Sequence, residues 1–320
     1  MGSNMSRASL AAALAVLFAQ AASPLAQAAQ PTDPEATVVQ ELVVTARVTG
    51  PAWWRVSKGD SVVWVLGVPP GLPKGAKWDA KVLEQHLAAA RQLILPATSS
   101  ASVFDIFALL GLLRKMKAGT PLEQTLPPDL RARFAAGAQA LHQTPSRYDR
   151  WNGVLAGLMM SADFHRAARL DAGEPTASIV RAARAHGLKP RPAAVYKGVR
   201  VLKTVADELN ETVDQACLSE ALDDIEGGAE RQYRAADGWA RGDVKLALAG
   251  STNFSHCVNL LPEGARMSRL SMGDEAGGIA AALEQPGQAV AVMPLRQLLA
   301  EDGVLEQLRA RGYEISAPDR

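Results

Sequence analysis

The chain has 320 residues, 48% of them hydrophobic, which is enough to bury a sizeable core in one large domain or two small ones. Its 34 basic and 33 acidic residues leave a formal charge of +1. Because this balance gives no overall field that attracts polyanions, neither nucleic acid nor an anionic membrane is implied as a partner.

The first residues have the pattern of a secretory signal peptide. Arg7 stands in a short positive region, an apolar run follows over residues 8–19, and Ala26-Gln27-Ala28 has the small-x-small form of a cleavage site. The apolar run is shorter than the roughly 20 residues that a bilayer-spanning helix needs. We therefore expect export, to the periplasm of a Gram-negative bacterium, and no membrane span. The alternative is an alanine-rich tail without a targeting role.

These features divide the chain into three parts. We predict a signal peptide over residues 1–28, a linker over residues 29–50 and one folded domain over residues 51–320, since Pro51 marks the start of regular patterns. The apolar stretch at residues 38–46 is either part of the linker or an edge strand.

The chain has two cysteines, Cys217 and Cys257. In an oxidising compartment the pair is a candidate disulfide, whereas in the cytosol two buried thiols are the simpler reading. In the chain-entropy view, a bridge over this spacing stabilises the fold by about 4 kcal/mol. A metal site is a weaker explanation, because neither cysteine has a CxxC partner.

The folded part opens with a hairpin. Two apolar runs, at residues 54–56 and 61–67, flank Lys58-Gly59-Asp60, which is typical of a turn between strands. The second run, SVVWVLG, is too uniformly apolar to have a wet face and should be buried in the sheet. A proline-rich loop follows its carboxyl end, where open α/β sheets bind ligands.

A helix and a second strand follow. Asp79 is a good N-cap for a helix over residues 80–90, and residues 92–95 form a buried strand that Pro96 ends. This order predicts that the second strand runs parallel to residues 61–67 and pairs with them.

Most of the remaining chain has helical patterns. They predict helices over residues 103–117, 128–141, 147–169, 176–186 and 196–209, a strand over residues 191–196, and a last buried strand over residues 289–293. The fold class is therefore α/β (α+β), with a small, mostly parallel or mixed sheet and a large helical insertion.

Three parts of the sequence carry a resemblance to a known family. They are the opening stretch around Gly67, the segment with Trp239, Gly242 and Asp243, and the end, with Asp-Gly-Val-Leu from residue 302 and Arg-Gly-Tyr from residue 311. Together they resemble the TraB/GumN family, which includes the animal Tiki proteases, over residues 53–315. The wider fold is similar to that of the erythromycin esterase and ChaN-type haem-binding proteins. We read Asp243 as a helix cap.

The resemblance implies metal or catalytic ligands that this chain lacks. In the family, a strand ends in Gly-x-x-His, a second strand ends in a glutamate, and a later strand leads to a second Gly-x-x-His. Here Gly67 is followed by Pro70, Pro96 stands at the glutamate position, and Pro294 and Gln297 stand at the second pair. Proline has no side-chain donor atom and a glutamine carbonyl is a poor zinc ligand, so the expected metal site has no ligands.

No other pattern supplies the missing chemistry. The five histidines have neither HExxH nor HxH spacing, and no Gly-x-Ser-x-Gly or P-loop is present. Asp223, Asp224 and Glu226 form a short acidic run that we expect to be solvated. We therefore predict no catalytic residue, no metal and no cofactor.

These observations favour an inactive relative of metalloproteases that acts by binding. The expected cleft lies between residues 67–73 and 294–300, and its candidate residues are Gly67, Pro70, Pro96, Arg296 and Gln297. Its apolar, proline-lined wall favours a peptide or a small apolar ligand, and Arg296 at the rim would fix a carboxylate. The alternatives are a metal-dependent hydrolase with relocated residues and a haem-binding protein.

Overall fold

The computed structural model describes residues 32–44, 50–100, 102, 105–171, 173–252 and 254–318. Residues 31–320 form one compact unit. The predicted signal peptide lies outside the described residues. None of the described helices combines the length and the apolar character that crossing a membrane requires.

A six-stranded mixed sheet is the centre of the fold, in the order β10-β1-β2-β9-β4-β7. The predicted hairpin is confirmed: β1 (Trp53–Lys58) and β2 (Ser61–Val68) are antiparallel, and Gly59 in their turn has a φ of +54°. β9 (Gly287–Pro294) runs parallel to β2 with Val68 opposite Pro294, and β4 (Ala90–Leu95) runs parallel to β9. β7 (Arg191–Pro192) and β10 (Glu314–Ser316) form the edges.

The predicted pairing between β2 and β4 is wrong, although their parallel direction is right. β9, from the end of the chain, lies between them. Residues 289–293 of β9 have no exposed surface, whereas only Leu93 and Ile94 of β4 are buried. β9 therefore shares the centre of the sheet with β2, where both faces are covered.

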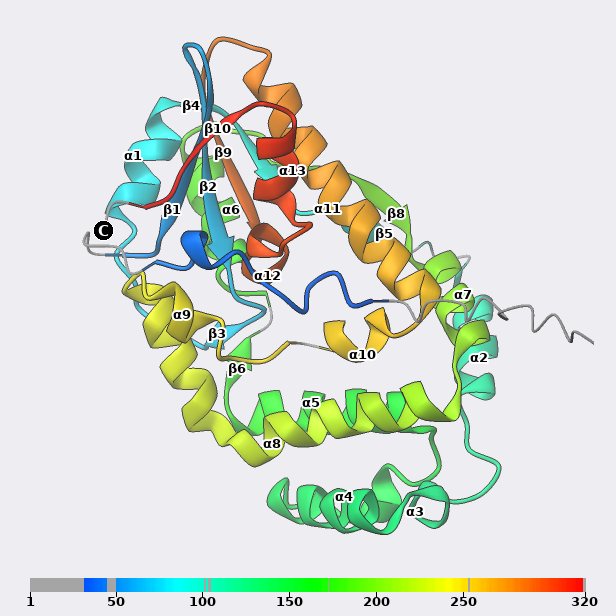
Figure 1. Ribbon diagram of the computed structural model, residues 1–320. Helices are drawn as coiled ribbons and strands as arrows, with labels where there is room; N and C mark the ends of the chain where they lie inside the picture. The colour runs from blue at the N-terminus through cyan, green and yellow to red at the C-terminus, as the bar shows by residue number, and fades with distance from the viewer. Residues whose placement is uncertain are drawn as a thin grey trace, which may run out of the picture. The chain divides into compact units, whose positions relative to one another are not determined.

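Helices cover the two faces of this sheet (Figure 1). α1 (Lys81–Ala89) packs on β9 and α6 (Thr176–Ala185), while α11 (Pro262–Leu283) packs on β2, β9 and α13 (Val304–Ala310). α12 (Leu295–Leu299) follows β9 directly and packs on β2. The carboxyl ends of β2, β9 and β4 lie at the same edge of the sheet, because these strands are parallel.

A second layer is helical and has its own apolar core. α4 (Pro128–Ala140), α5 (Gly153–Ala167) and α8 (Glu211–Ala240) bury Phe134, Met160 and Leu222 between them. α5 and α8 approach closely at their first turns, where the backbone oxygen of Asp214 leaves no room for a Cβ on Gly153. The apolar side chains of α5 therefore pack in a core, as their helical spacing indicates.

α8 bends at Gly228, whose φ of +71° lies outside the helical region. The bend directs the second half of the helix towards the sheet, as Figure 1 shows. There the indole Nε1 of Trp239 donates a hydrogen bond to the Gly67 carbonyl, at 2.7 Å. The next helix, α9 (Val244–Ala247), begins with the predicted cap, since Asp243 Oδ1 accepts the Leu246 N–H. This junction joins the two layers.

The remaining elements are short. They are η1 (Gln40–Leu42), β3 (Leu72–Pro73), β5 (Thr98–Ser100), α2 (Ile106–Lys115), α3 (Leu122–Thr125), η3 (Pro145–Arg147), β6 (Leu170–Asp171), β8 (Val195–Lys197), α7 (Gly198–Glu208) and α10 (Ser255–Asn259). The sulfur atoms of Cys217 in α8 and Cys257 in α10 lie 2.05 Å apart, at disulfide distance as predicted.

Two element predictions need correction, and the structure also describes part of the stretch at residues 38–46, for which two alternatives were open. The helix expected over residues 147–169 begins only at Gly153, because Asn152 caps it by accepting the Leu155 N–H. The strand expected over residues 191–196 is divided between β7 and β8, which belong to different sheets. In the described part of residues 38–46, only Val38 forms a strand bridge, to Ala300, and a short 3₁₀ helix follows.

Candidate functional site

A cavity of about 310 Å³ lies where the parallel strands end. Four of the five predicted cleft residues, Pro70, Pro96, Arg296 and Gln297, line it together. They come from the loop after β2, the loop after β4 and from α12, so the shared carboxyl edge of the sheet brings them together. The remaining lining residues are Glu35, Val68, Pro69, Thr176, Ser251, Thr252, Ser255, Pro294 and Leu295.

Gly67, the fifth candidate, does not line this cavity. A Cβ at this position would lie 2.5 Å from Leu295 Cδ1 and 3.3 Å from the Trp54 ring, so the absence of a side chain lets α12 pack against β2. Its carbonyl accepts the hydrogen bond from Trp239. Gly67 therefore positions the helix that carries Arg296 and Gln297.

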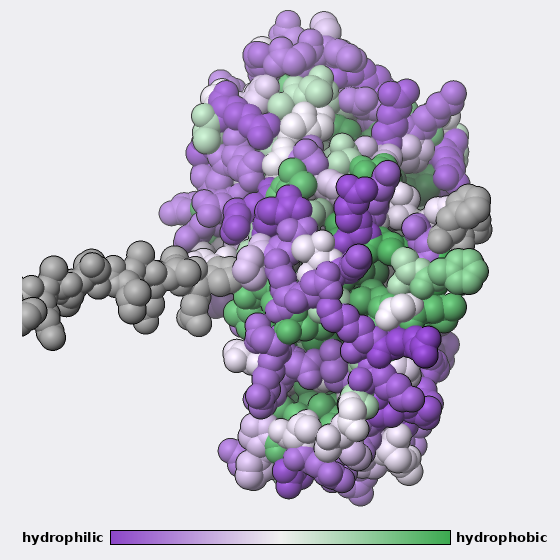
Figure 2. Space-filling view, turned by 90° about the vertical axis from the view of Figure 1, so that its right-hand side faces the viewer, coloured by the Kyte–Doolittle hydropathy of each residue, from purple (hydrophilic) through white to green (hydrophobic). Residues whose placement is uncertain are grey.

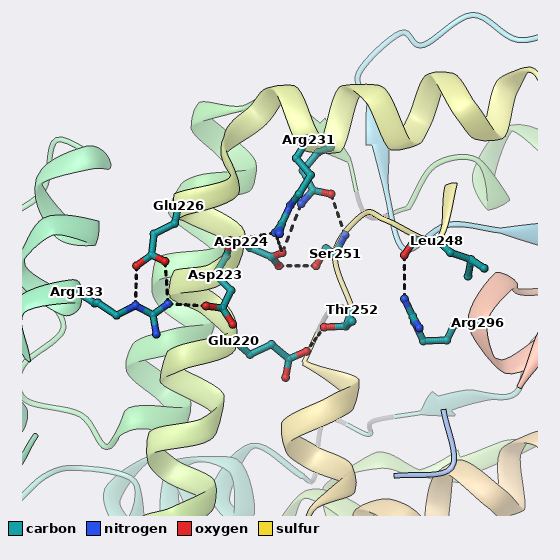
Figure 3. A network of polar contacts seen from close by, with 11 residues as sticks. Arg133, Glu220, Asp223, Asp224, Glu226, Arg231, Leu248, Ser251, Thr252 and Arg296 are labelled. Atoms are coloured by element: carbon teal, nitrogen blue, oxygen red, sulfur yellow. Dashed lines mark hydrogen bonds and ion pairs between the residues drawn. The ribbon is translucent and has the colours of Figure 1, made fainter. Parts of the chain in front are cut away.

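Arg296 supplies the cation of the cavity. Its Nη2 donates to the Leu248 carbonyl at 2.9 Å, which holds the side chain across the cavity wall (Figure 3). Within the described part of the chain, no carboxylate lies at ion-pair distance from this guanidinium. A carboxylate ligand would therefore meet a positive charge that the protein has not already neutralised.

Gln297 is held by Glu35, a residue that the sequence patterns did not single out. Glu35 is only 5% exposed, and its Oε1 accepts from Gln297 Nε2 at 3.0 Å and from Ser268 Oγ at 2.7 Å. These contacts attach the segment before the central sheet to α11 and α12. The side chain of Gln297 is therefore engaged in a structural hydrogen bond.

A second buried carboxylate lies behind Pro96. Glu275 of α11 is 1% exposed, and its Oε1 accepts the Ala97 N–H at 3.1 Å. Its Oε2 is buried and has no hydrogen-bond partner among the residues that the structure describes. Burial raises the pKa of Glu275 to about 7, and the nearby charge of Glu35 acts in the same direction. Glu275 does not itself line the cavity.

The loop of residues 250–252 forms another wall and connects to an acidic network (Figure 3). Ser251 Oγ donates to Asp224 Oδ2 at 2.5 Å, and the Ser251 N–H donates to Gln232. Arg231 pairs with the same aspartate at 2.6 Å. Beyond Thr252, a groove of about 410 Å³ adjoins the cavity and is lined in part by Glu220, Asp223, Asp224 and His256.

The prediction that the acidic run is solvated is wrong for one of its members. Asp224 is buried, and burial raises its pKa while the Ser251 hydrogen bond and the Arg231 charge act in the opposite direction. Asp223 and Glu226 are exposed and share Arg133 as an ion-pair partner. Helical spacing places Asp224 on the inner face of α8. The prediction treated the three acidic residues as one exposed run and therefore did not separate Asp224 from the other two.

The donor atoms around the cavity do not fit a metal ion. Its lining offers one carboxylate, from Glu35, together with hydroxyls and the Gln297 amide, and contains neither histidine nor cysteine. In the described ranges, no three or more histidine, cysteine, aspartate or glutamate residues are grouped so that they could hold a metal. The proline and glutamine positions thus leave the carboxyl edge of the sheet without a ligand set.

The histidines that have described contacts are used elsewhere. His86 stacks on Trp64 with ring centroids 4.3 Å apart, and burial lowers its pKa to about 4. His186 pairs with Glu84, and His256 pairs with Asp33. His165 lines only a small pocket beside the cavity, and burial lowers its pKa as well.

The fold and the site define a class: a mixed α/β protein with its cavity at the carboxyl edge of a largely parallel sheet and a helical layer beside it. Comparison with known families is more specific. The sequence matches the TraB/PrgY/gumN family over residues 52–317, so the chain belongs to this family. No curated protein and no solved structure matches the chain.

Proposed function

We propose that this protein is an exported, periplasmic member of the TraB/PrgY/gumN family that binds a peptide or a small apolar ligand and has no hydrolytic activity. The observation that carries this proposal is the convergence of Pro70, Pro96, Arg296 and Gln297 on one cavity. Three of these residues occupy positions where the family resemblance implies metal or catalytic groups, and none of the three is a usual metal ligand.

The lining of the cavity indicates how a ligand would lie. Val68, Pro69, Pro70 and Leu295 provide an apolar surface, and prolines lose little conformational freedom when a ligand covers them. Arg296 provides one fixed charge. A peptide with a free C-terminal carboxylate therefore fits this lining: an apolar side chain would contact the apolar surface, and the terminal carboxylate would pair with Arg296.

Calorimetry with matched peptides tests this proposal. Apolar peptides with a free C-terminus should bind, and their amidated forms should bind at least about tenfold more weakly, because a charge-assisted hydrogen bond contributes about 1.5 kcal/mol or more. Arg296→Gln should abolish this difference. Arg311→Gln, a change at an exposed arginine that does not line the cavity, is the control.

The competing function, a metal-dependent hydrolase with relocated residues, predicts a different result. Titration of the purified protein with zinc or manganese would then show tight, stoichiometric binding, and that outcome would contradict the proposed lack of activity. Equal binding of free and amidated peptides would instead contradict only the proposed role of Arg296 and not the binding of a ligand in the cavity.

A further inference from the structure

Helix α2 presents its apolar side to solvent. Five of its large apolar residues are exposed, to an extent that ranges from 37% for Leu113 to 83% for Phe107, and no described residue of the helix is buried. At 3.6 residues per turn, the exposed residues occupy an arc of about 160°. A surface helix of a globular protein normally turns such an arc towards the core. The exposed residues of this arc are Ile106, Phe107, Leu109, Leu110 and Leu113.

The exposed surface continues onto α7, which packs against α2. Leu202 of α7 is also about half exposed, and Lys115 of α2 pairs with Asp207 of α7, which holds the two helices together. We call the five α2 residues with Leu202 the α2 patch. It contains six of the ten large apolar side chains that are exposed in the described residues. Figure 2 shows hydrophobic residues gathered on this side of the molecule, among hydrophilic ones.

Basic residues surround the α2 patch. Residues 105–117 and 197–208, which include α2 and α7, contain six basic and three acidic residues, a net charge of +3, whereas the whole chain carries +1. The bond to Lys115 and the charge of Lys203 lower the pKa of Asp207, so these cations lie close together. Arg114, Lys117 and Arg200 are also exposed. The nearly neutral total charge thus conceals a basic region at the α2 patch.

We propose that the α2 patch docks on an anionic lipid surface. An interfacial helix has this arrangement: Phe and Leu side chains enter the boundary between headgroups and acyl chains, and flanking Lys and Arg side chains meet the phosphates. A second copy of the chain is the less suitable occupant, because a two-fold pairing through this patch brings the same cations of both copies together.

Vesicle flotation tests the proposal with the full chain. Binding to vesicles of phosphatidylcholine mixed with phosphatidylglycerol should exceed binding to phosphatidylcholine alone. The double variant Phe107→Asp/Leu110→Asp should bind the mixed vesicles at least about tenfold more weakly, because two buried apolar side chains are lost. Arg114→Gln/Lys117→Gln should lose about tenfold and most of the preference for the anionic lipid.

A matched control is available on α11. Leu270 is 40% exposed and lies outside the α2 patch, so Leu270→Asp should leave vesicle binding unchanged. All of these side chains are exposed, and unchanged thermal unfolding should confirm that the variants fold.

Three outcomes would overturn the proposal. If the Phe107→Asp/Leu110→Asp variant still binds the mixed vesicles, the binding belongs to another segment, such as the apolar run at residues 8–19. Equal binding to neutral and anionic vesicles would also overturn it. So would a lipid-free dimer, seen by sedimentation, that this variant abolishes.

Discussion

Glu275 shows how a single buried carboxylate can make the stability of this protein depend on pH. Its pKa is about 7 in the folded state and close to 4.5 when the chain is unfolded, so the folded state holds the proton more tightly. The stabilisation by this proton is fully present below pH 4.5 and is lost as the pH rises through 7. A shift of this size corresponds to at most about 3 kcal/mol.

The variant Glu275→Gln should remove this dependence. Glutamine keeps an oxygen for the Ala97 N–H but carries no charge, so the variant should be more stable than the wild type at pH 8 by about 1 to 3 kcal/mol, and similar to it at pH 4.5. Urea unfolding at both pH values measures the difference. Glu230→Gln, at an exposed position of α8, is the control. Equal destabilisation at both pH values would show that the effect does not depend on protonation and would contradict the raised pKa of Glu275.

At the scale of elements, the cysteine pair links α8 to α10, as does the hydrogen bond from the Cys257 N–H to Glu220. Cys217 and Cys257 are fully buried in a small apolar cluster with Val154, Val213 and Phe254. The bond closes a loop over a separation of 40 residues, so in the chain-entropy model it stabilises the protein by about 4 kcal/mol.

Replacing both cysteines by alanine should therefore lower the free energy of unfolding by about 4 kcal/mol. A reducing agent should destabilise the wild type by a similar amount and leave the variant unaffected. Non-reducing mass mapping of the wild type should find the linked peptides. Two thiols that react with an alkylating agent before reduction would contradict both the bond and the proposed export.

At the scale of the whole molecule, one cavity brings together the positions where the family resemblance implies metal or catalytic groups. Pro70 and Gln297 line one cavity, so Pro70→His/Gln297→His would place two imidazoles at the same edge of the sheet. Pro96 would still stand where the family resemblance implies a glutamate, and proline has no donor atom for a metal. We expect this double variant to remain inactive towards fluorogenic peptides in zinc or manganese, since a metal hydrolase needs its complete ligand set.

The triple variant that also carries Pro96→Glu is the informative comparison. Cleavage by the double variant would mean that a carboxylate already present, such as Glu35, completes the site. In that case the cavity has lost only its imidazoles.

The strands β2, β4 and β9 could be predicted because each contains a short apolar run, and a turn residue or a proline follows it. Their order could not, because the run that became β9 lies far along the chain and nothing in its local pattern specifies its neighbours. The same limit applies to the site. Pro70, Pro96, Arg296 and Gln297 follow predicted strands, whereas Glu35 and Ser251 lie in irregular segments whose place depends on tertiary contacts.

The contacts of Glu35 also mean that an early part of the chain builds the cavity. Glu35 lines it, and Val38 bridges to Ala300 just after α12. Chain ends are where proteases cut most readily. Trimming of the chain beyond residue 38 would therefore remove Glu35 from the lining of the cavity and leave the core of the sheet in place, so the cavity would be open on that side.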